Sequence, residues 1–265
     1  MTTDHSAETL LIEGADAIAF AQGQFSSNVS ALSVGQWQFS AWLDAQGRVR
    51  ALFHLARIAH DSLLLLLRGG DAASLAQGLQ RFVFRAKVKL SAQPTRALGT
   101  GPALNTYAFH DEGDLRIYGC GTHSLVVGHA SDDTWRSLQI REGWPWLPAS
   151  TIGELLPQAI SLERLQAVAF DKGCYPGQEI VARLHYRGGL KRHMHCVVLS
   201  PKLTGGTVLR QNGKTVGQLL DAVHDEGGAT ALAVIDDDVI DLLKSHASVA
   251  IDESITLRVV QSWSA

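Results

Sequence analysis

One cysteine of this chain, Cys174, stands among residues that would make its thiol reactive. Lys172 lies two residues before it, and Gly173 and Gly177 flank it on either side. A nearby cation and the positive end of a helix dipole both lower a cysteine pKa and increase the thiolate fraction. The segment therefore predicts nucleophilic, redox or metal-ligating chemistry at Cys174. The alternative is a small apolar residue in a tight loop, because unpaired cysteines are often buried for packing alone.

The element expected to position this thiol is a short amphipathic helix that begins at Pro176, a residue type suited to the first helical turn. Its apolar residues fall at helical spacing: Ile180, Val181 and Leu184. Its charged residues recur every fourth position on another face: Glu179, Arg183 and Arg187. Cys174 would then precede the helix, where unpaired backbone N–H groups stabilise negative charge.

This region resembles the signature of the YgfZ-type folate-binding proteins, which are relatives of the glycine-cleavage T-protein. The matching residues are Lys172, Gly173, Cys174, Tyr175, Gly177, Gln178, Glu179, Ala182, Arg183, Arg187, Gly188, Lys191 and Arg192. Further matching residues are Gly14-Ala15-Asp16, Gln22-Gly23-Gln24, residues 44–48, Trp135 with Leu138, Ile140, Gly143 and Pro145, and Pro157-Gln158. Most of the first 192 residues are covered, and the rest matches only in general character.

The resemblance implies a cytoplasmic protein that binds tetrahydrofolate or a derivative and supports assembly or repair of iron–sulfur clusters. Its partners would be the cluster-assembly machinery or client enzymes, including those that thiolate tRNA. Cys174 would be the functionally required thiol, with Lys172 beside it, and Trp135 would stack on the pterin. The remaining residues expected to bind folate are Arg141, Tyr175, Gln178, Glu179, Arg183 and Arg187.

The chain departs from the family pattern at two places. A second folate-contacting tryptophan expected near the N-terminus is missing from residues 7–11. The aspartate that acts on the folate nitrogen in the aminomethyltransferases is replaced by Ala51-Leu52. Because neither side chain can accept a proton, we expect no glycine-cleavage activity. A folate-dependent one-carbon transferase or a thiol-dependent enzyme is the alternative to an accessory protein.

Composition excludes several other classes of function. The 265 residues are 46% hydrophobic and 18% charged, with a net charge of −3, which is typical of a globular chain with a full core. That charge gives no reason to expect direct binding to nucleic acid. The N-terminus lacks a signal-peptide pattern, and the leucine run at residues 63–67 is too short to cross a membrane.

Cysteine and histidine spacing gives no strong metal motif. The three cysteines form no Cys-x-x-Cys pair and no even disulfide framework. His193 and His195 would share one face of a strand, but Cys196 would point away, so a metal site there is disfavoured. A cluster scaffold with Cys174 as one ligand is a third class, although iron–sulfur clusters ordinarily need four cysteines.

The periodicity predicts an α+β fold. Helices are expected at residues 14–24 and 71–82, the second capped by Asp71, and strands at 36–43, 49–56, 62–68 and 86–91. After Gly188-Gly189, short strands alternate with turns, and Asn212-Gly213 is a strong hairpin signal. By analogy with the T-protein fold we expect a discontinuous folate-binding domain (1–45 and 99–187), an inserted α+β subdomain (46–98) and a C-terminal β-barrel (188–265).

Overall fold

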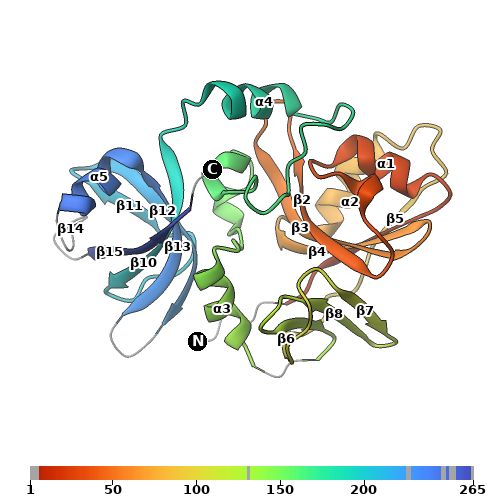
Figure 1. Ribbon diagram of the computed structural model, residues 1–265, viewed down its shortest axis with the longest axis horizontal. Coiled ribbons are helices and arrows are strands. Elements are labelled where there is room, and N and C mark those ends of the chain that lie inside the picture. Colours follow the sequence, from red (N-terminus) through yellow and green to blue (C-terminus); the bar gives the residue numbers. More distant parts are fainter. Residues whose placement is uncertain (1–5, 130–131, 225–227, 246–248, 251–254, 264–265) are drawn as a thin grey trace.

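The computed structural model describes residues 6–129, 132–224, 228–245, 249–250 and 255–263. Figure 1 shows two β-rich bodies on either side of a central segment that contains helix α3 (Thr134–Glu142), with a smaller sheet below. The predicted mixed fold of sheets and few helices, similar to that of the T-protein, is confirmed. No helix among the described residues combines the length and the apolarity needed to span a membrane.

The first sheet contains five antiparallel strands in the order β2-β3-β4-β1-β5. Its strands are β1 (Thr9–Glu13), β2 (Gln36–Leu43), β3 (Val49–Ala59), β4 (Ser62–Gly69) and β5 (Lys89–Ala92). Two helices, α1 (Ala17–Gln24) and α2 (Ala72–Gln80), share a hydrophobic core with one face of this sheet. The predicted cap of α2 is present, because the Asp71 side chain accepts a hydrogen bond from Ser74 N at 2.6 Å.

A second, four-stranded antiparallel sheet lies next to the first, in the order β6-β9-β8-β7. Its strands are β6 (Leu98–Gly101), β7 (Phe109–Glu112), β8 (Leu115–Gly119) and β9 (Ser124–Val127). The chain then runs through α3 and three short elements: η2 (Ala149–Thr151), η3 (Pro157–Ile160) and α4 (Gln178–Arg187). A further short helix, η1 (Val29–Ala31), follows α1.

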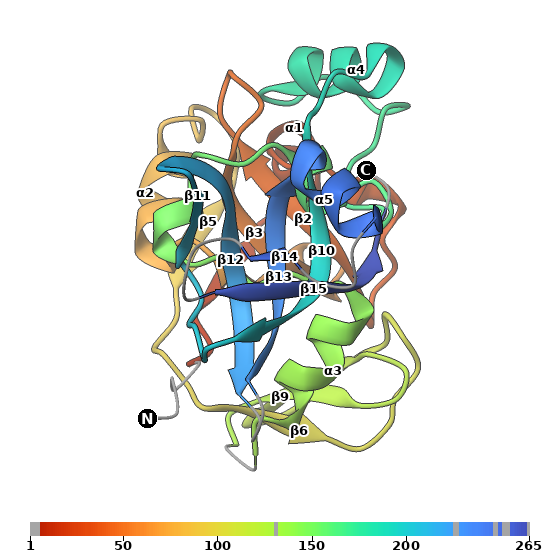
Figure 2. The ribbon, with the colours of Figure 1, turned by 90° about the vertical axis from the view of Figure 1, so that its left-hand side faces the viewer.

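The C-terminal strands form a six-stranded antiparallel sheet in the order β11-β12-β13-β10-β15-β14. The elements are β10 (Arg192–Ser200), β11 (Val208–Gln211), β12 (Lys214–His224), β13 (Ala229–Asp236), α5 (Asp237–Ser245), β14 (Val249–Ala250) and β15 (Thr256–Ser262). Figure 2 shows this sheet facing the viewer, with β15 running across β13. The Asn212-Gly213 turn joins β11 to β12 with φ values of 51° and 77°, as the sequence predicts.

One hydrophobic core joins the three sheets. It includes Trp37 of the first sheet, Tyr118 of the second, Trp135 of α3 and Met194 of the third. The domain boundary expected at residues 45/46 falls inside the β2–β3 hairpin, whose strands pair in a single sheet. The boundary expected at 98/99 falls inside β6, and only the one at 187/188 coincides with the end of an element, α4. The domain division as a whole stays a prediction.

Candidate functional site

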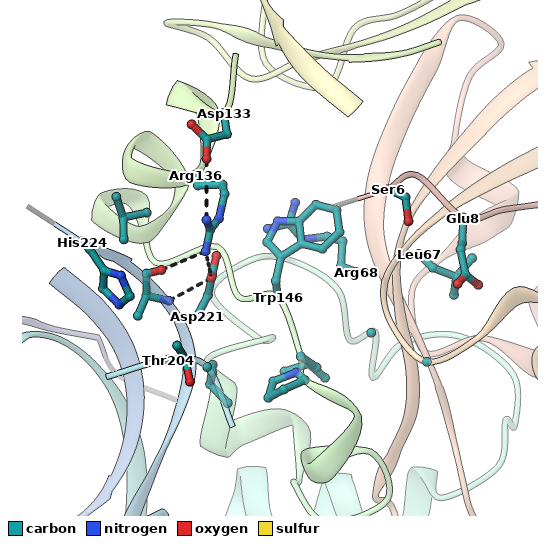
Figure 3. Close-up of a pocket in the computed structure, with 18 residues that line it drawn as sticks. Ser6, Glu8, Leu67, Arg68, Asp133, Arg136, Trp146, Thr204, Asp221 and His224 are labelled. Atoms are coloured by element: carbon teal, nitrogen blue, oxygen red, sulfur yellow. Dashed lines mark hydrogen bonds and ion pairs between the residues drawn. The ribbon is translucent and has the colours of Figure 1, made fainter. Parts of the chain in front are cut away.

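A cavity of about 680 Å³ lies where the first sheet, the central segment and the C-terminal sheet meet. Figure 3 shows Arg68 and Trp146 on one side of it, and Arg136 with Asp221 on another. Arg68 is the penultimate residue of β4, Arg136 belongs to α3, and Asp221 lies on β12. Its volume is within the range of pockets that bind drug-sized ligands, about 300–1,000 Å³.

Arg68 is fully buried, and its hydrogen-bond partners within the described ranges are all neutral groups. Its Nη1 lies 2.7 Å from Gln139 Oε1 and 3.1 Å from His54 Nε2. Nη2 and Nε donate to the carbonyl oxygens of Trp144 and Pro145, at 2.9 and 3.0 Å. No ion pair of Arg68 occurs among the described residues. The guanidinium therefore gives this wall of the cavity a positive charge that no contacting carboxylate cancels.

Burial dominates the electrostatics of this network. It lowers the pKa of Arg68 to about 9, although the charges of Cys120 and Asp221 act in the opposite direction. Burial, and then the positive charge of Arg68, hold the pKa of His54 well below its usual value of 6.5. His54 is therefore neutral at pH 7, so its Nε2 can accept the hydrogen bond from Arg68.

Trp146 presents its ring to the cavity, with the Arg68 guanidinium 4.5 Å from the ring centroid. The indole Nε1 donates to Gln139 Oε1 at 3.2 Å, which fixes the orientation of the ring. Trp135, the residue expected to stack on the pterin, is 1% exposed and packs on Trp146 with centroids 5.0 Å apart. It is not among the described residues that line the cavity. The role expected for Trp135 is not tested by this arrangement, in which Trp146 lines the cavity and packs on Trp135.

An ion pair connects α3 to the C-terminal sheet at the cavity edge. Arg136 Nη2 lies 2.7 Å from Asp221 Oδ1 and donates to the carbonyl oxygen of Ala222 at 2.8 Å. Both side chains are more than nine-tenths buried. Glu8 and Asp133 also line the cavity, so it offers hydrogen-bond acceptors as well as cations.

Cys174 is exposed and lies in the loop before α4, as predicted, but the helix begins at Gln178 rather than at the expected Pro176, after Gly177 in a left-handed conformation. Lys172 Nζ donates to the carbonyl oxygens of Phe25 and Ser27, at 2.6 and 2.7 Å, and lies 5.0 Å from the centroid of the Tyr175 ring. Burial lowers the pKa of Lys172 to about 8, whereas the two carbonyl groups favour its charged form. The observed contacts make Lys172 an anchor of the loop, and its expected effect on the thiol stays a prediction.

The other predicted site residues lie on or next to α4, or in the case of Arg141 on α3, rather than in the cavity. Tyr175 is buried, and burial followed by the charge of Glu163 raises its pKa to about 12. Gln178 begins α4, while Glu179, Arg183 and Arg187 lie along it as exposed side chains. Arg141 is exposed in the last turn of α3. None of these residues is among the described ones that line the cavity, and their assignment to folate stays a prediction.

Two glycines allow the Cys174 loop to pack closely against the β2–β3 turn. Gly47 and Gly177 both have φ of 78°, a backbone conformation that residues other than glycine rarely adopt. A Cβ atom on Gly177 would lie 2.5 Å from Asp44 O and 2.7 Å from Gly47 Cα. The two segments of the expected signature, residues 44–48 and 172–187, are therefore in direct backbone contact.

The positions that replace the aminomethyltransferase aspartate are apolar and buried. Ala51 and Leu52 lie on β3 and are 1% and 0% exposed.

The disfavoured metal ligands form other contacts: His193 binds Asp237 at 2.7 Å, His195 binds Ser262 at 2.8 Å, and Cys196 is buried. No group of three or more His, Cys, Asp or Glu side chains suited to a metal occurs in the part of the chain that the structure describes.

The chain resembles known proteins over most of its length, although no family model matches it. The tRNA-modifying protein YgfZ of Photobacterium profundum is 29% identical over 264 residues, which cover 85% of this chain and 80% of that protein. The protein of the same name from Sodalis glossinidius is 25% identical over 273 residues, covering 86% and 82%. The resemblance to the YgfZ-type proteins is confirmed.

A solved structure supports the fold. The glycine cleavage system aminomethyltransferase T of Bartonella henselae matches with a TM-score of 0.74, covering 96% of this chain and 83% of that one. At 16% identity this likeness shows the fold alone. The YgfZ-type signature and the T-protein fold are thus two separate findings, one from sequence and one from architecture.

Sequence reasoning missed the centre of the cavity. The sequence pattern predicts Arg68 only as the end of a strand, and it does not single out Gln139. The hydrogen bonds of Arg68 to Gln139 and to Pro145 O span 71 and 77 residues, so no local pattern indicates them. One signal was available: an arginine directly after five consecutive leucines must leave the core or find buried hydrogen-bond partners.

Proposed function

We propose that this chain binds tetrahydrofolate or a derivative in the cavity beside Trp146 and Arg68. The observation that carries the proposal is this combination of an aromatic face, a buried cation and a cavity of about 680 Å³ in a T-protein-like fold. Aromatic side chains stack on planar heterocycles such as a pterin ring. The resemblance to YgfZ-type proteins supports a folate-related function.

The lining matches the mixed polarity of a reduced folate. Carboxylates such as Glu8 and Asp221 accept hydrogen bonds from N–H groups, which a pterin carries on its pyrimidine edge. Arg68 provides positive charge for the carboxylates of the glutamate tail, whereas the charge of Arg136 is already paired with Asp221. We assign the stacking contact to Trp146, and Trp135 would support it from behind through their packing.

We further propose an accessory role in iron–sulfur cluster assembly or repair, in the cytoplasm, through which the protein supports tRNA modification indirectly. The exposed Cys174 thiol supports this role, because a partner protein can reach it. One thiol is too few for a cluster that four cysteines ordinarily hold, so the assembly machinery or a client enzyme would supply the other ligands. The apolar Ala51 and Leu52 argue against glycine-cleavage chemistry.

Titration calorimetry with tetrahydrofolate tests the binding site. Trp146→Leu should weaken binding about 3- to 10-fold, in line with about 0.5–1.5 kcal/mol for one aromatic contact. Cys174→Ala should leave the affinity unchanged, because the thiol lies in the loop before α4 and does not line the cavity. Trp135→Leu should have a smaller effect than Trp146→Leu, since it alters only the support of the ring.

The outcomes separate the alternatives. Unchanged affinity in Trp146→Leu would remove the proposed site, and an equal loss in Cys174→Ala would mean that the thiol shapes the pocket.

An absorbance spectrum of anaerobically purified protein tests the accessory role. A cluster spectrum from the chain alone would favour a scaffold instead.

A further inference from the structure

We propose that a second pocket, lined in part by Thr9 and Leu11 of β1, binds a small anionic molecule with an apolar body, such as a medium-chain carboxylate. The pocket has a volume of about 350 Å³ and lies between the first sheet and the four-stranded sheet. Its apolar walls come from both sheets: Leu11, Ile58, Leu64, Pro94 and Val127. Two partly buried arginines, Arg96 and Arg116, also line the pocket, together with the neutral polar residues Thr9 and Gln93.

Arg96 is held at this pocket by its backbone and by a glycine. Its N–H donates to Ala7 O at 3.1 Å, and its carbonyl oxygen accepts from Ala7 N at 2.8 Å. Its guanidinium lies against Gly128, where a Cβ atom would be 2.8 Å from Nη2. Gly128 has φ of 112°, a conformation suited to glycine, and directly follows Val127 of the pocket wall. The local backbone therefore leaves room for the charged head of Arg96.

The pocket carries positive charge without an acid of its own. None of the described residues that line it is Asp or Glu, and no ion pair of Arg96 occurs in the described part of the chain. Arg116 Nε lies 3.6 Å from Asp111 Oδ1, outside the lining, in a partly exposed pair that leaves its other nitrogens available. This differs from the first cavity, where carboxylates and arginines are mixed.

These features define the chemical class of the ligand. Guanidinium groups bind carboxylates through two parallel hydrogen bonds, and two arginines at one pocket favour a single anionic group. Aliphatic walls favour a hydrocarbon body rather than a sugar or a peptide backbone, which would leave polar groups unpaired. The volume, at the lower end of the range for ligand pockets, limits that body to a short chain or a single ring system.

Calorimetry of the full chain with octanoate tests the inference. Two comparison ligands each keep one of its features: 1-octanol keeps the hydrocarbon chain, and acetate keeps the carboxylate. Octanoate should bind at least about tenfold more tightly than either. Arg96→Gln should weaken octanoate binding about tenfold or more, consistent with the loss of a charge-assisted hydrogen bond worth about 1.5–3 kcal/mol. Arg81→Gln, which removes an exposed arginine elsewhere, is the matched control.

A filling variant tests the apolar part separately. Ile58→Trp should abolish octanoate binding by occupying the pocket while both arginines remain, and a thermal unfolding curve confirms that each variant folds. Absence of octanoate binding to the native chain would overturn the proposal, as would equal binding of octanol. Equal affinity in Arg96→Gln and Arg81→Gln would also overturn it.

Discussion

At the scale of single residues, the buried contact between Arg68 and His54 makes the stability of the fold depend on the protonation of His54. The pKa of His54 is held well below 6.5 by burial and by Arg68. Below pH 6.5 the unfolded chain therefore takes up a proton that the folded chain excludes, and the free energy of unfolding falls as the pH falls.

We expect His54→Gln to reduce this pH dependence, because the amide keeps a hydrogen-bond acceptor for Arg68 and does not titrate. Urea unfolding at pH 7.0 and 5.5 measures the effect. The variant should lose about 1–2 kcal/mol at pH 7 from altered packing and hydrogen bonding. Its further loss at pH 5.5 should be smaller than that of the native chain. The exposed His60→Gln is the control, and an unchanged pH dependence in His54→Gln would contradict the prediction.

At the scale of elements, the position of α4 and of the Cys174 loop depends on the backbone contact between Gly47 and Gly177. A side chain at Gly177 meets two penalties: an unfavourable positive φ and a collision with the β2–β3 turn. The φ penalty alone is about 1–2 kcal/mol. The collision must in addition displace α4 or the turn, since the atoms that it meets belong to the backbone.

Gly177→Ala should therefore destabilise more than Gly213→Ala, which has nearly the same φ, 77°, but no atom within 4 Å of the new Cβ. The difference in the free energy of unfolding between the two variants measures the contribution of the contact between the Cys174 loop and the β2–β3 turn. Urea unfolding gives the stability, and hydrogen exchange should show faster exchange of the α4 amides in Gly177→Ala alone. Equal losses and equal exchange in the two variants would show that the contact contributes nothing.

At the scale of the whole molecule, the buried ion pair of Arg136 and Asp221 joins the central segment to the C-terminal sheet. Asp221→Asn should lower the free energy of unfolding by about 3 kcal/mol, because it leaves a buried arginine without its carboxylate. Glu154→Gln breaks the exposed pair of Arg48 and Glu154, 46% and 66% exposed, and should cost less than about 1 kcal/mol.

Asp221→Asn also tests whether the C-terminal sheet unfolds together with the rest of the chain. If the ion pair couples the C-terminal sheet to the rest of the chain, Asp221→Asn should broaden the thermal transition or split it into two, as calorimetry would record. The Glu154→Gln chain should keep a single transition of native width. A loss of less than about 1 kcal/mol in Asp221→Asn would show that water or Asp133 compensates the charge.

The sequence by itself determined the local elements and the kind of protein. The spacing after Pro176 predicted α4, Asp71 predicted the cap of α2, and Asn212-Gly213 predicted the β11–β12 turn. These features depend on contacts within a few residues, so periodicity and turn chemistry are enough to find them. The signature around Cys174 also led to the YgfZ-type proteins.

Only the tertiary structure decided which side chains form the cavity. It placed Trp146, which packs on Trp135, in the cavity lining and directed Lys172 to the carbonyl groups of Phe25 and Ser27. It also surrounded Arg68 with groups from α3 and the segment after it. Burial and hydrogen bonding between residues 71 or more positions apart depend on how the sheets pack, and no local pattern records that packing.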